Sequence, residues 1–155
     1  MRLNKFIAES GIASRRKADE LIRNGLVKIN GTVCENLGTV IDENKDSIEV
    51  ENKPISLVTQ RVIYLLNKPR GVVTTASDPE HRQTVMDFVP DSPRVFPCGR
   101  LDVDTMGLVV LTNDGNLCYQ LTHPRFEHQK EYRVVGRSKD PQRSWEKLQK
   151  PHNLS

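Results

Sequence analysis

The sequence predicts an α+β protein made of two consecutive units. Near the N-terminus, apolar residues recur at helical spacing and then give way to the alternation of short strands. In the second half, short apolar runs outnumber helical stretches and are separated by loops of varied length, which favours a largely antiparallel sheet. The chain has 155 residues, enough for one ordinary domain or two small ones.

The first unit, residues 1–58, is expected to begin with two short helices. Gly11 is suited to end the first helix, and Ser14 is a good N-cap for the second, which Asn24-Gly25 ends. The apolar sides of the two helices consist of Leu3, Phe6 and Ile7, and then of Ala18, Leu21 and Ile22. This spacing predicts two amphipathic helices that share one core.

A small antiparallel sheet is expected to complete the first unit. Val27–Ile29 and Thr32–Cys34 alternate on the two sides of Asn30-Gly31. An Asn-Gly dipeptide between alternating segments is the strongest short-range signal for a hairpin. Ile48–Val50 is a further short strand, and residues 51–61 are interpreted as the end of the sheet and a linker.

The second unit, residues 59–155, is expected to contain more strands than helices. The expected strands are Val62–Leu66, interpreted as a buried strand, Val72–Thr75, the central strand Val109–Leu111, and Lys130–Gly136. The expected helices are Thr84–Val89, ended by Pro90, and Gly115–Thr122, ended by His123-Pro124. These elements indicate an α+β domain on a mainly antiparallel sheet.

Charge is distributed unevenly along the chain, although the net charge is only +3. Residues 1–33 carry seven Lys and Arg against three acids, whereas residues 34–60 carry two against six. A basic segment of this kind indicates an anionic partner. On charge alone, a helix face whose basic residues only solubilise it remains the alternative.

Composition argues against several classes of protein. The N-terminus lacks the long apolar run of a signal peptide, and no segment approaches the roughly 18 apolar residues of a membrane span. The three cysteines, Cys34, Cys98 and Cys118, are odd in number and far apart, which favours reduced thiols in a cytoplasmic protein over disulfides or zinc. The histidines form no ligand spacing, and no Gly-rich phosphate loop is present, so neither a metal nor a cofactor is expected.

The segment Gly99–Leu108 is the most informative for chemistry. It places Arg100 and two carboxylates, Asp102 and Asp104, between glycines and ahead of an apolar run. From the residues alone, a turn or capping aspartate is the simpler interpretation of Asp102. Spacing does not separate the two carboxylates, because residues two apart on a strand share a face.

The first unit resembles the alpha-L RNA-binding motif. The matching segments are Arg2–Ile7, Ser14–Ala18 and Gly25–Gly31. The resemblance implies that the second helix and the hairpin contact an RNA backbone, where basic side chains neutralise phosphates without specifying the base sequence. It assigns RNA binding to Arg2, Lys5, Arg15, Arg16, Lys17, Arg23 and Lys28.

Three parts of the second unit resemble the pseudouridine synthases that modify ribosomal RNA and carry an alpha-L motif in front. They are Leu66–Gly71, Gly99–Leu108 with Leu111–Gly115, and His123-Pro124 with Lys130–Tyr132. The implied reaction breaks the bond between uracil and ribose, turns the base and rejoins it through carbon, without a cofactor. The resemblance assigns the catalytic role to Asp102, either as nucleophile or as base.

The same resemblance implies roles for the residues around Asp102. Arg100 is similar to an arginine that enters the helix stack where the uridine leaves; an ion pair with Asp102 or Asp104 is the alternative. Tyr132 is similar to a tyrosine that stacks on the target base, although a tyrosine in a strand is more often a core residue. Lys130 is expected to neutralise a phosphate or to orient the site. The resemblance assigns the shape of the pocket to Thr105, Gly107 and Leu108. It assigns RNA contact to Lys68 and Arg70.

The resulting hypothesis is a monomeric, cytoplasmic enzyme that isomerises a uridine in ribosomal RNA and has no membrane partner. The segment Arg94–Asp102 looks nearer to the enzymes of the large subunit. One alternative is a non-catalytic RNA-binding protein that uses residues 1–33. Another is a hydrolase that uses Asp102 and Asp104, which needs carboxylates about 5–9 Å apart across a sugar.

The resemblance also indicates a C-terminally truncated chain, either a fragment of a longer enzyme or a shortened homologue without activity. Enzymes of this family continue past the Lys130–Tyr132 strand to a motif whose arginine pairs with the catalytic aspartate. The tail Ser144–Ser155 contains nothing similar. We therefore expect a partial catalytic domain that has low activity alone, or none, and that leaves an unpaired sheet edge and exposed apolar surface.

Overall fold

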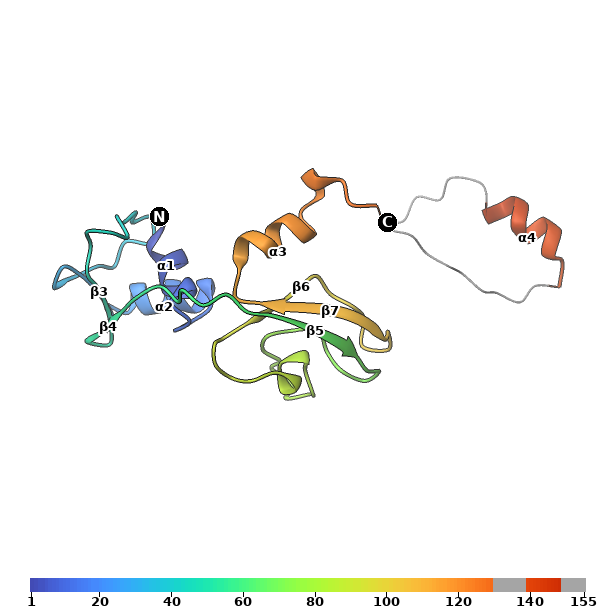
Figure 1. Ribbon diagram of the computed structural model, residues 1–155, viewed down its shortest axis with the longest axis horizontal. Helices are drawn as coiled ribbons and strands as arrows, with labels where there is room; N and C mark the ends of the chain where they lie inside the picture. The colour runs from blue at the N-terminus through green and yellow to red at the C-terminus, as the bar shows by residue number, and fades with distance from the viewer. Residues whose placement is uncertain (130–138, 149–155) are drawn as a thin grey trace.

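The computed structural model describes residues 1–129 and 139–148 and contains helices together with two antiparallel sheets (Figure 1). The N-terminal unit contains α1 (Leu3–Glu9), α2 (Arg15–Arg23), β1 (Val27–Ile29), β2 (Thr32–Val33), β3 (Ile48–Val50) and β4 (Lys53–Ile55). The second unit contains β5 (Ile63–Lys68), η1 (Val85–Phe88), β6 (Phe96–Cys98), β7 (Gly107–Thr112), α3 (Gly115–Thr122) and η2 (Pro124–Phe126), and α4 (Pro141–Leu148) follows. This confirms the predicted α+β class.

Helices α1 and α2 pack together over the small sheet and form a core of their own. The Ser14 hydroxyl accepts a hydrogen bond from the Lys17 N–H at 3.2 Å, so Ser14 caps α2 as predicted. The buried core residues are Leu3, Phe6, Ile7, Ala13, Ala18, Ile22, Val27, Ile41, Ile48 and Val50. Because burial of one large aliphatic side chain contributes about 1.5–3 kcal/mol, these residues hold the small unit together.

The predicted hairpin forms at Asn30-Gly31. Both residues adopt the left-handed backbone conformation, with φ of 51° and 80°, which is the geometry of the tight turn that joins β1 to β2. The Asn30 side chain also accepts from the Ser47 N–H and donates to Asp46, each at 2.9 Å. These bonds connect the turn to the segment before β3, and the strand order of the sheet is β2-β1-β3-β4.

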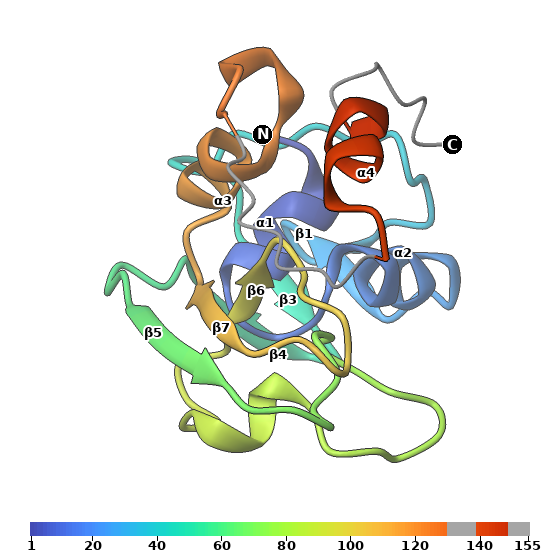
Figure 2. The same cartoon turned by 90° about the vertical axis from the view of Figure 1, so that its right-hand side faces the viewer.

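The second sheet has the order β5-β7-β6, and β7 is antiparallel to both neighbours. The apolar run Val109–Leu111 is therefore in the central strand, as predicted. Helix α3 lies on one side of this sheet and η1 on the other (Figures 1 and 2). On the η1 side the buried core consists of Val72, Val85, Val95, Val109 and Leu111.

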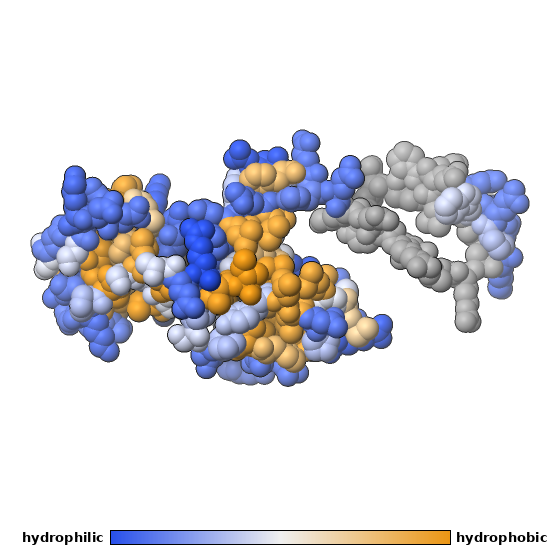
Figure 3. All heavy atoms as spheres, in the orientation of Figure 1, coloured by the Kyte–Doolittle hydropathy of each residue, from blue (hydrophilic) through white to orange (hydrophobic). Residues whose placement is uncertain are grey.

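One strand prediction is wrong in its burial. The segment Val62–Leu66 was expected to be buried, but β5 alternates, and the side chains of Ile63 and Leu65 are 55% and 70% exposed. Leu108 on the paired strand β7 is 65% exposed. Apolar side chains gather over this sheet in Figure 3, and within the described residues β5 has a partner strand on one side only. The expected unpaired edge and exposed apolar surface are thus present in this part of the chain.

Two other elements differ from expectation or lie outside the described residues. Val72–Thr75 makes only an isolated parallel bridge, Val73 to Thr84, in place of the predicted strand. The predicted strand Lys130–Gly136 lies outside the described residues. In contrast, η1 is the expected short helix, with Thr84 as its cap, and α3 has the expected bounds. None of the helices in the described ranges is long and apolar enough to cross a membrane.

Candidate active site

Asp102 lies in the loop between β6 and β7. The Thr105 N–H donates to the Asp102 carbonyl at 3.0 Å and closes a turn over Val103 and Asp104. The loop ends at Gly107, whose φ of 146° would strain a residue that carries a side chain. Asp102 and Asp104 are thus loop residues, and the argument that they share the face of a strand was wrong.

The backbone on both sides of Asp102 is held by the segment that follows β5. The Thr74 hydroxyl donates to the Leu101 carbonyl at 2.7 Å and accepts from the Leu101 N–H at 3.2 Å. On the other side, the Gly71 N–H donates to the Val103 carbonyl at 2.8 Å. Because its two chain neighbours are fixed in this way, the position of the Asp102 backbone is defined.

Lys68 contributes to the same framework, which corrects its predicted role. Its side chain has no exposed surface, and its ammonium donates to the carbonyls of Pro69, Val72 and Val103 at 3.1, 2.8 and 3.2 Å. A buried ammonium whose three donors all reach backbone carbonyls is satisfied within the protein and is not available to a phosphate. The prediction that Lys68 contacts RNA is therefore wrong, whereas Arg70 in the same loop is exposed.

The side chains of Asp102 and Arg100 are exposed and have no protein partner among the described residues. Within residues 1–129 and 139–148, neither forms an ion pair or a side-chain hydrogen bond, so the ion pair considered as an alternative for Arg100 is not formed there. An unpaired carboxylate on a backbone held on both sides can approach a ligand without first breaking a protein contact. This arrangement suits a group that acts as a nucleophile or a base.

Two of the predicted site residues, one assigned to base displacement and one to the pocket, meet in one hollow beside the Asp102 loop. The hollow has a volume of about 640 Å³, and Arg100 and Leu108 line it together with His123 and His128. Asp102 and Thr105 are not among its lining residues, although Leu101 is. Lys130 and Tyr132, predicted to complete the site, lie outside the described residues.

The thiol that lines this hollow is not a competing nucleophile. Cys98 on β6 lines the same hollow. Burial, together with the neighbouring Cys118 thiol, raises the pKa of Cys98 to about 12. Because the thiolate is the reactive form, Cys98 remains neutral and unreactive at physiological pH. In the described part of the chain, no cluster of three or more His, Cys, Asp or Glu side chains could hold a metal ion.

The predicted RNA-binding side chains of the first unit lie at its surface to different degrees. Arg2, Arg15, Arg16, Lys17 and Arg23 are exposed, and Lys5 and Lys28 are partly buried. Lys17 pairs with Glu20 at 2.7 Å and Lys5 with Glu9 at 3.5 Å. These pairs lie along a helix, are open to solvent and are worth little, so both lysines can exchange their partner for a phosphate.

The structure brings two of these side chains to the second unit. Lys5 and Arg15 line a cleft of about 540 Å³ together with Arg94, which lies just before β6. Sequence reasoning did not identify Arg94 as a binding residue. The only local signal is its position after Ser92-Pro93, since proline and serine mark a surface loop rather than a strand.

Comparison with known proteins agrees with both halves of this description. A sequence model of the RNA pseudouridylate synthase family matches residues 62–154, and a model of the S4 domain matches residues 1–46. The chain belongs to the RNA pseudouridylate synthase family. Its N-terminal helices and hairpin are an S4 domain, which confirms the predicted resemblance of this unit.

Several similar relatives are bacterial proteins that are longer than this chain. An uncharacterized RNA pseudouridine synthase of Aquifex aeolicus (strain VF5) is 42% identical over 150 residues, which cover 96% of this chain and 60% of the relative. The ribosomal large subunit pseudouridine synthase B of Bacillus subtilis (strain 168) is 44% identical over 150 residues, or 96% and 61% of the two chains. The dual-specificity RNA pseudouridine synthase RluF of Escherichia coli (strain K12) is 44% identical over 140 residues, which cover 87% of this chain and 46% of the relative.

Proposed function

We propose that this chain provides the S4 domain and the Asp102 loop of an enzyme that isomerises uridine to pseudouridine in ribosomal RNA. The observation that carries the proposal is the exposed Asp102 carboxylate, which has no partner in the described part of the chain and lies on a loop held on both sides. It lies inside the part of the chain that matches the family. The chain spans about 60% of the length of its first relatives, so the reaction is proposed for the whole enzyme.

In the proposed reaction, Asp102 is the catalytic residue and needs no cofactor. The bond between N1 of uracil and C1′ of ribose breaks, and a bond between C5 and C1′ forms. One proton leaves C5 and one is gained at N1, so atoms and charge balance. Asp102 acts either by attack on the sugar or by removal of a sugar proton, and both actions need the ionised carboxylate.

The other site residues are proposed to act on the RNA. Arg100 fills the place of the extruded uridine, since the target base must leave the helix stack to expose its glycosidic bond. Tyr132 and Lys130 are proposed to contact the base and a phosphate, and Thr105 and Leu108 to shape the pocket. Basic side chains distributed in this way suit binding to the RNA backbone that does not depend on base sequence. Phosphate contact is proposed for Arg2, Lys5, Arg15, Arg16, Lys17, Arg23, Lys28 and Arg70.

We propose the large ribosomal subunit as the source of the substrate. The support is the segment Arg94–Asp102 and the name of the Bacillus subtilis relative, which refers to that subunit. We also propose that residues 1–58 and 59–155 are separate domains of a monomeric, cytoplasmic protein. Each unit has its own buried cluster, which favours this division. Cooperative unfolding of residues 1–58 expressed alone, and sedimentation of the full chain at the mass of one chain, would support it.

The reaction is tested by supplying ribosomal RNA and detecting pseudouridine through base-specific chemical labelling. Because a fragment and a whole enzyme differ in activity, the assay compares this chain with a version extended to the length of its relatives. In the extended version, we expect Asp102→Asn to lower the rate by at least a thousandfold, whereas the matched change Asp104→Asn leaves it within about tenfold, since only one carboxylate does the chemistry.

Two outcomes would contradict this proposal. An Asp102→Asn enzyme as active as its parent would remove Asp102 from the mechanism. RNA binding by the extended parent without any pseudouridine formation would instead favour a non-catalytic RNA-binding protein.

A further inference from the structure

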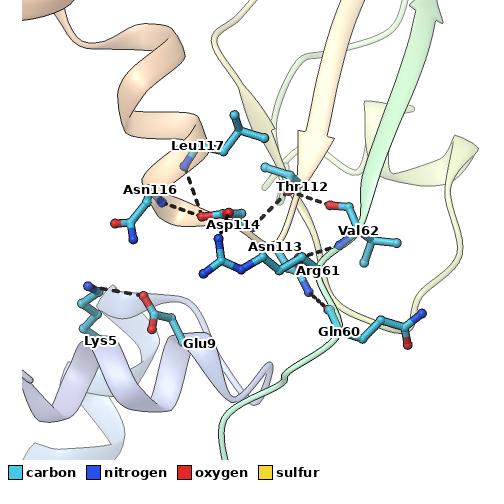
Figure 4. Close-up of polar contacts among 10 residues, drawn as sticks. All are labelled: Lys5, Glu9, Gln60, Arg61, Val62, Thr112, Asn113, Asp114, Asn116 and Leu117. Carbon is cyan, nitrogen blue, oxygen red and sulfur yellow. Dashed lines mark hydrogen bonds and ion pairs between the residues drawn. The ribbon is translucent and has the colours of Figure 1, made fainter.

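The linker between the two units is bonded to both of them, and Figure 4 shows its contacts with the second unit. On the S4 side, the Val58 N–H donates to the Glu9 carbonyl at 3.2 Å. On the other side, the Asn113 amide accepts from the Val62 N–H at 3.0 Å and donates to the Gln60 carbonyl at 2.8 Å. Thr59 alone separates the two attachments, so there is little free chain between the units.

The corner between β7 and α3 holds the far end of the linker through three consecutive residues. Thr112 donates from its hydroxyl to the Val62 carbonyl at 2.6 Å, next to the Asn113 contacts. Asp114 forms an ion pair with Arg61 and also caps α3 by accepting from its first backbone N–H groups. Partial burial opposes ionisation of Asp114, but these N–H groups and the Arg61 guanidinium together hold its pKa below the ordinary value.

The cleft of about 540 Å³ lies at this junction, with one wall from each unit. The S4 wall is formed by α1 and the start of α2, including Lys5 and Arg15. The opposite wall includes Arg94, Phe96 of β6 and Tyr119 of α3. Because the linker is bonded to both units, it holds these walls at a defined separation. The volume of the cleft lies in the range of pockets that enclose one small ligand.

The walls carry the two kinds of side chain that bind a single nucleic acid strand. Arg15 and Arg94 form no ion pair or side-chain hydrogen bond within the described ranges, so their guanidinium groups are available to an anion. The Tyr119 side chain is 43% exposed and contributes aromatic surface to the cleft. Strand-binding sites combine basic groups that follow phosphates with aromatic rings on which bases stack.

We propose that the cleft between the S4 domain and the catalytic unit binds a single-stranded segment of the RNA substrate, next to the target site. Phosphates lie against Arg15 and Arg94, and a base stacks on Tyr119. A duplex is a poorer occupant, because its bases are already stacked on each other. The inference rests on the proposed function in that it takes RNA as the partner, and it adds a site that connects the two units.

Binding of a labelled single-stranded oligoribonucleotide of about 12 residues to the full 155-residue chain tests the proposal. We expect Arg15→Ala and Arg94→Ala each to weaken binding. The number of counterions released on binding, obtained from the salt dependence of the affinity, should fall by about one in each variant. The matched controls Lys45→Ala and Arg82→Ala also remove one positive charge, but from side chains that are paired outside the cleft. Tyr119→Ala is expected to weaken binding about tenfold through lost stacking, and Tyr119→Phe to retain it.

A second measurement locates the RNA without any substitution. An oligoribonucleotide that carries 4-thiouridine is bound to the parent chain and irradiated, and the crosslinked peptides are identified by mass spectrometry. We expect crosslinks on the peptides that contain Phe96 and Tyr119.

Three outcomes separate this inference from the proposed function. If the parent binds RNA but the cleft variants behave like their controls, and crosslinks fall elsewhere, the cleft site is overturned and the proposed reaction stands. If RNA occupies the cleft but the extended enzyme makes no pseudouridine, the reaction is overturned and the cleft site stands. If the parent binds no RNA, the cleft site is overturned, and the pseudouridine assay of the extended enzyme decides the reaction by itself.

Discussion

At the scale of single residues, the charged side chains of Lys68 and Asp102 have different roles. Lys68 supports the structure of the loop, and Asp102 is the candidate for chemistry. The Lys68 ammonium is buried and satisfied by three backbone carbonyls, one of them from Val103 beside Asp102. The Asp102 carboxylate is exposed and has no partner among the described residues. Lys68 is thus a positioning residue for the loop that presents Asp102.

We predict that Lys68→Met destabilises the protein and loosens this loop. Methionine retains the apolar stem but leaves buried carbonyls without a donor, which we expect to lower the free energy of unfolding by about 3 kcal/mol. Urea unfolding measures the loss, and the exchange rate of the Gly71 amide, which bonds to Val103, reports on the loop. Arg70→Met is the matched control, because Arg70 is exposed in the same loop. Equal stability of the two variants would contradict the role of Lys68.

At the scale of elements, local signals predicted α3 and the hairpin well. The Asp114 cap and the apolar spacing of α3 lie within a few residues of each other, and the Asn30-Gly31 turn determines the register of its own strands. Burial of β5 was predicted incorrectly, since an apolar run in a strand does not reveal how many faces are covered. That depends on which elements pack on the sheet, and Ile63 and Leu65 face outward.

We predict that the two contacts of Asp114 differ in strength. Asp114→Ala removes both the cap of α3 and the ion pair with Arg61, and it is expected to cost about 1 kcal/mol of stability, most of it from the cap. Asp114→Asn keeps a capping oxygen and loses only the ion pair with the largely exposed Arg61, so it is expected to cost less than about 0.5 kcal/mol. Thermal and urea unfolding of both variants check this order. Equal losses in the two variants would show that the ion pair dominates.

At the scale of the whole molecule, a short linker attached at both ends connects two separate cores. The S4 core and the core under the second sheet share no residue. Asn113 is central to the connection, because its one amide group holds both Gln60 and Val62. The cleft between the units therefore depends on a side chain that neither core contains.

We predict that Asn113→Ala frees the two units to move relative to each other. The radius of gyration from small-angle scattering should rise, while circular dichroism shows unchanged secondary structure. Gln60→Ala is the control, since its backbone carbonyl, which is the group that Asn113 contacts, remains in place. An unchanged radius of gyration in Asn113→Ala would mean that other contacts hold the junction.

The sequence by itself determined the fold class, most elements, the family and the choice of Asp102 as the candidate catalyst. These features depend on periodicity, turn residues and motifs, all of which are local along the chain. Only the tertiary structure decided that Lys68 is buried, that β5 has an exposed apolar face, and that Arg94 lies across a cleft from Arg15. Burial and juxtaposition depend on contacts between residues far apart in sequence, and no local pattern encodes these contacts.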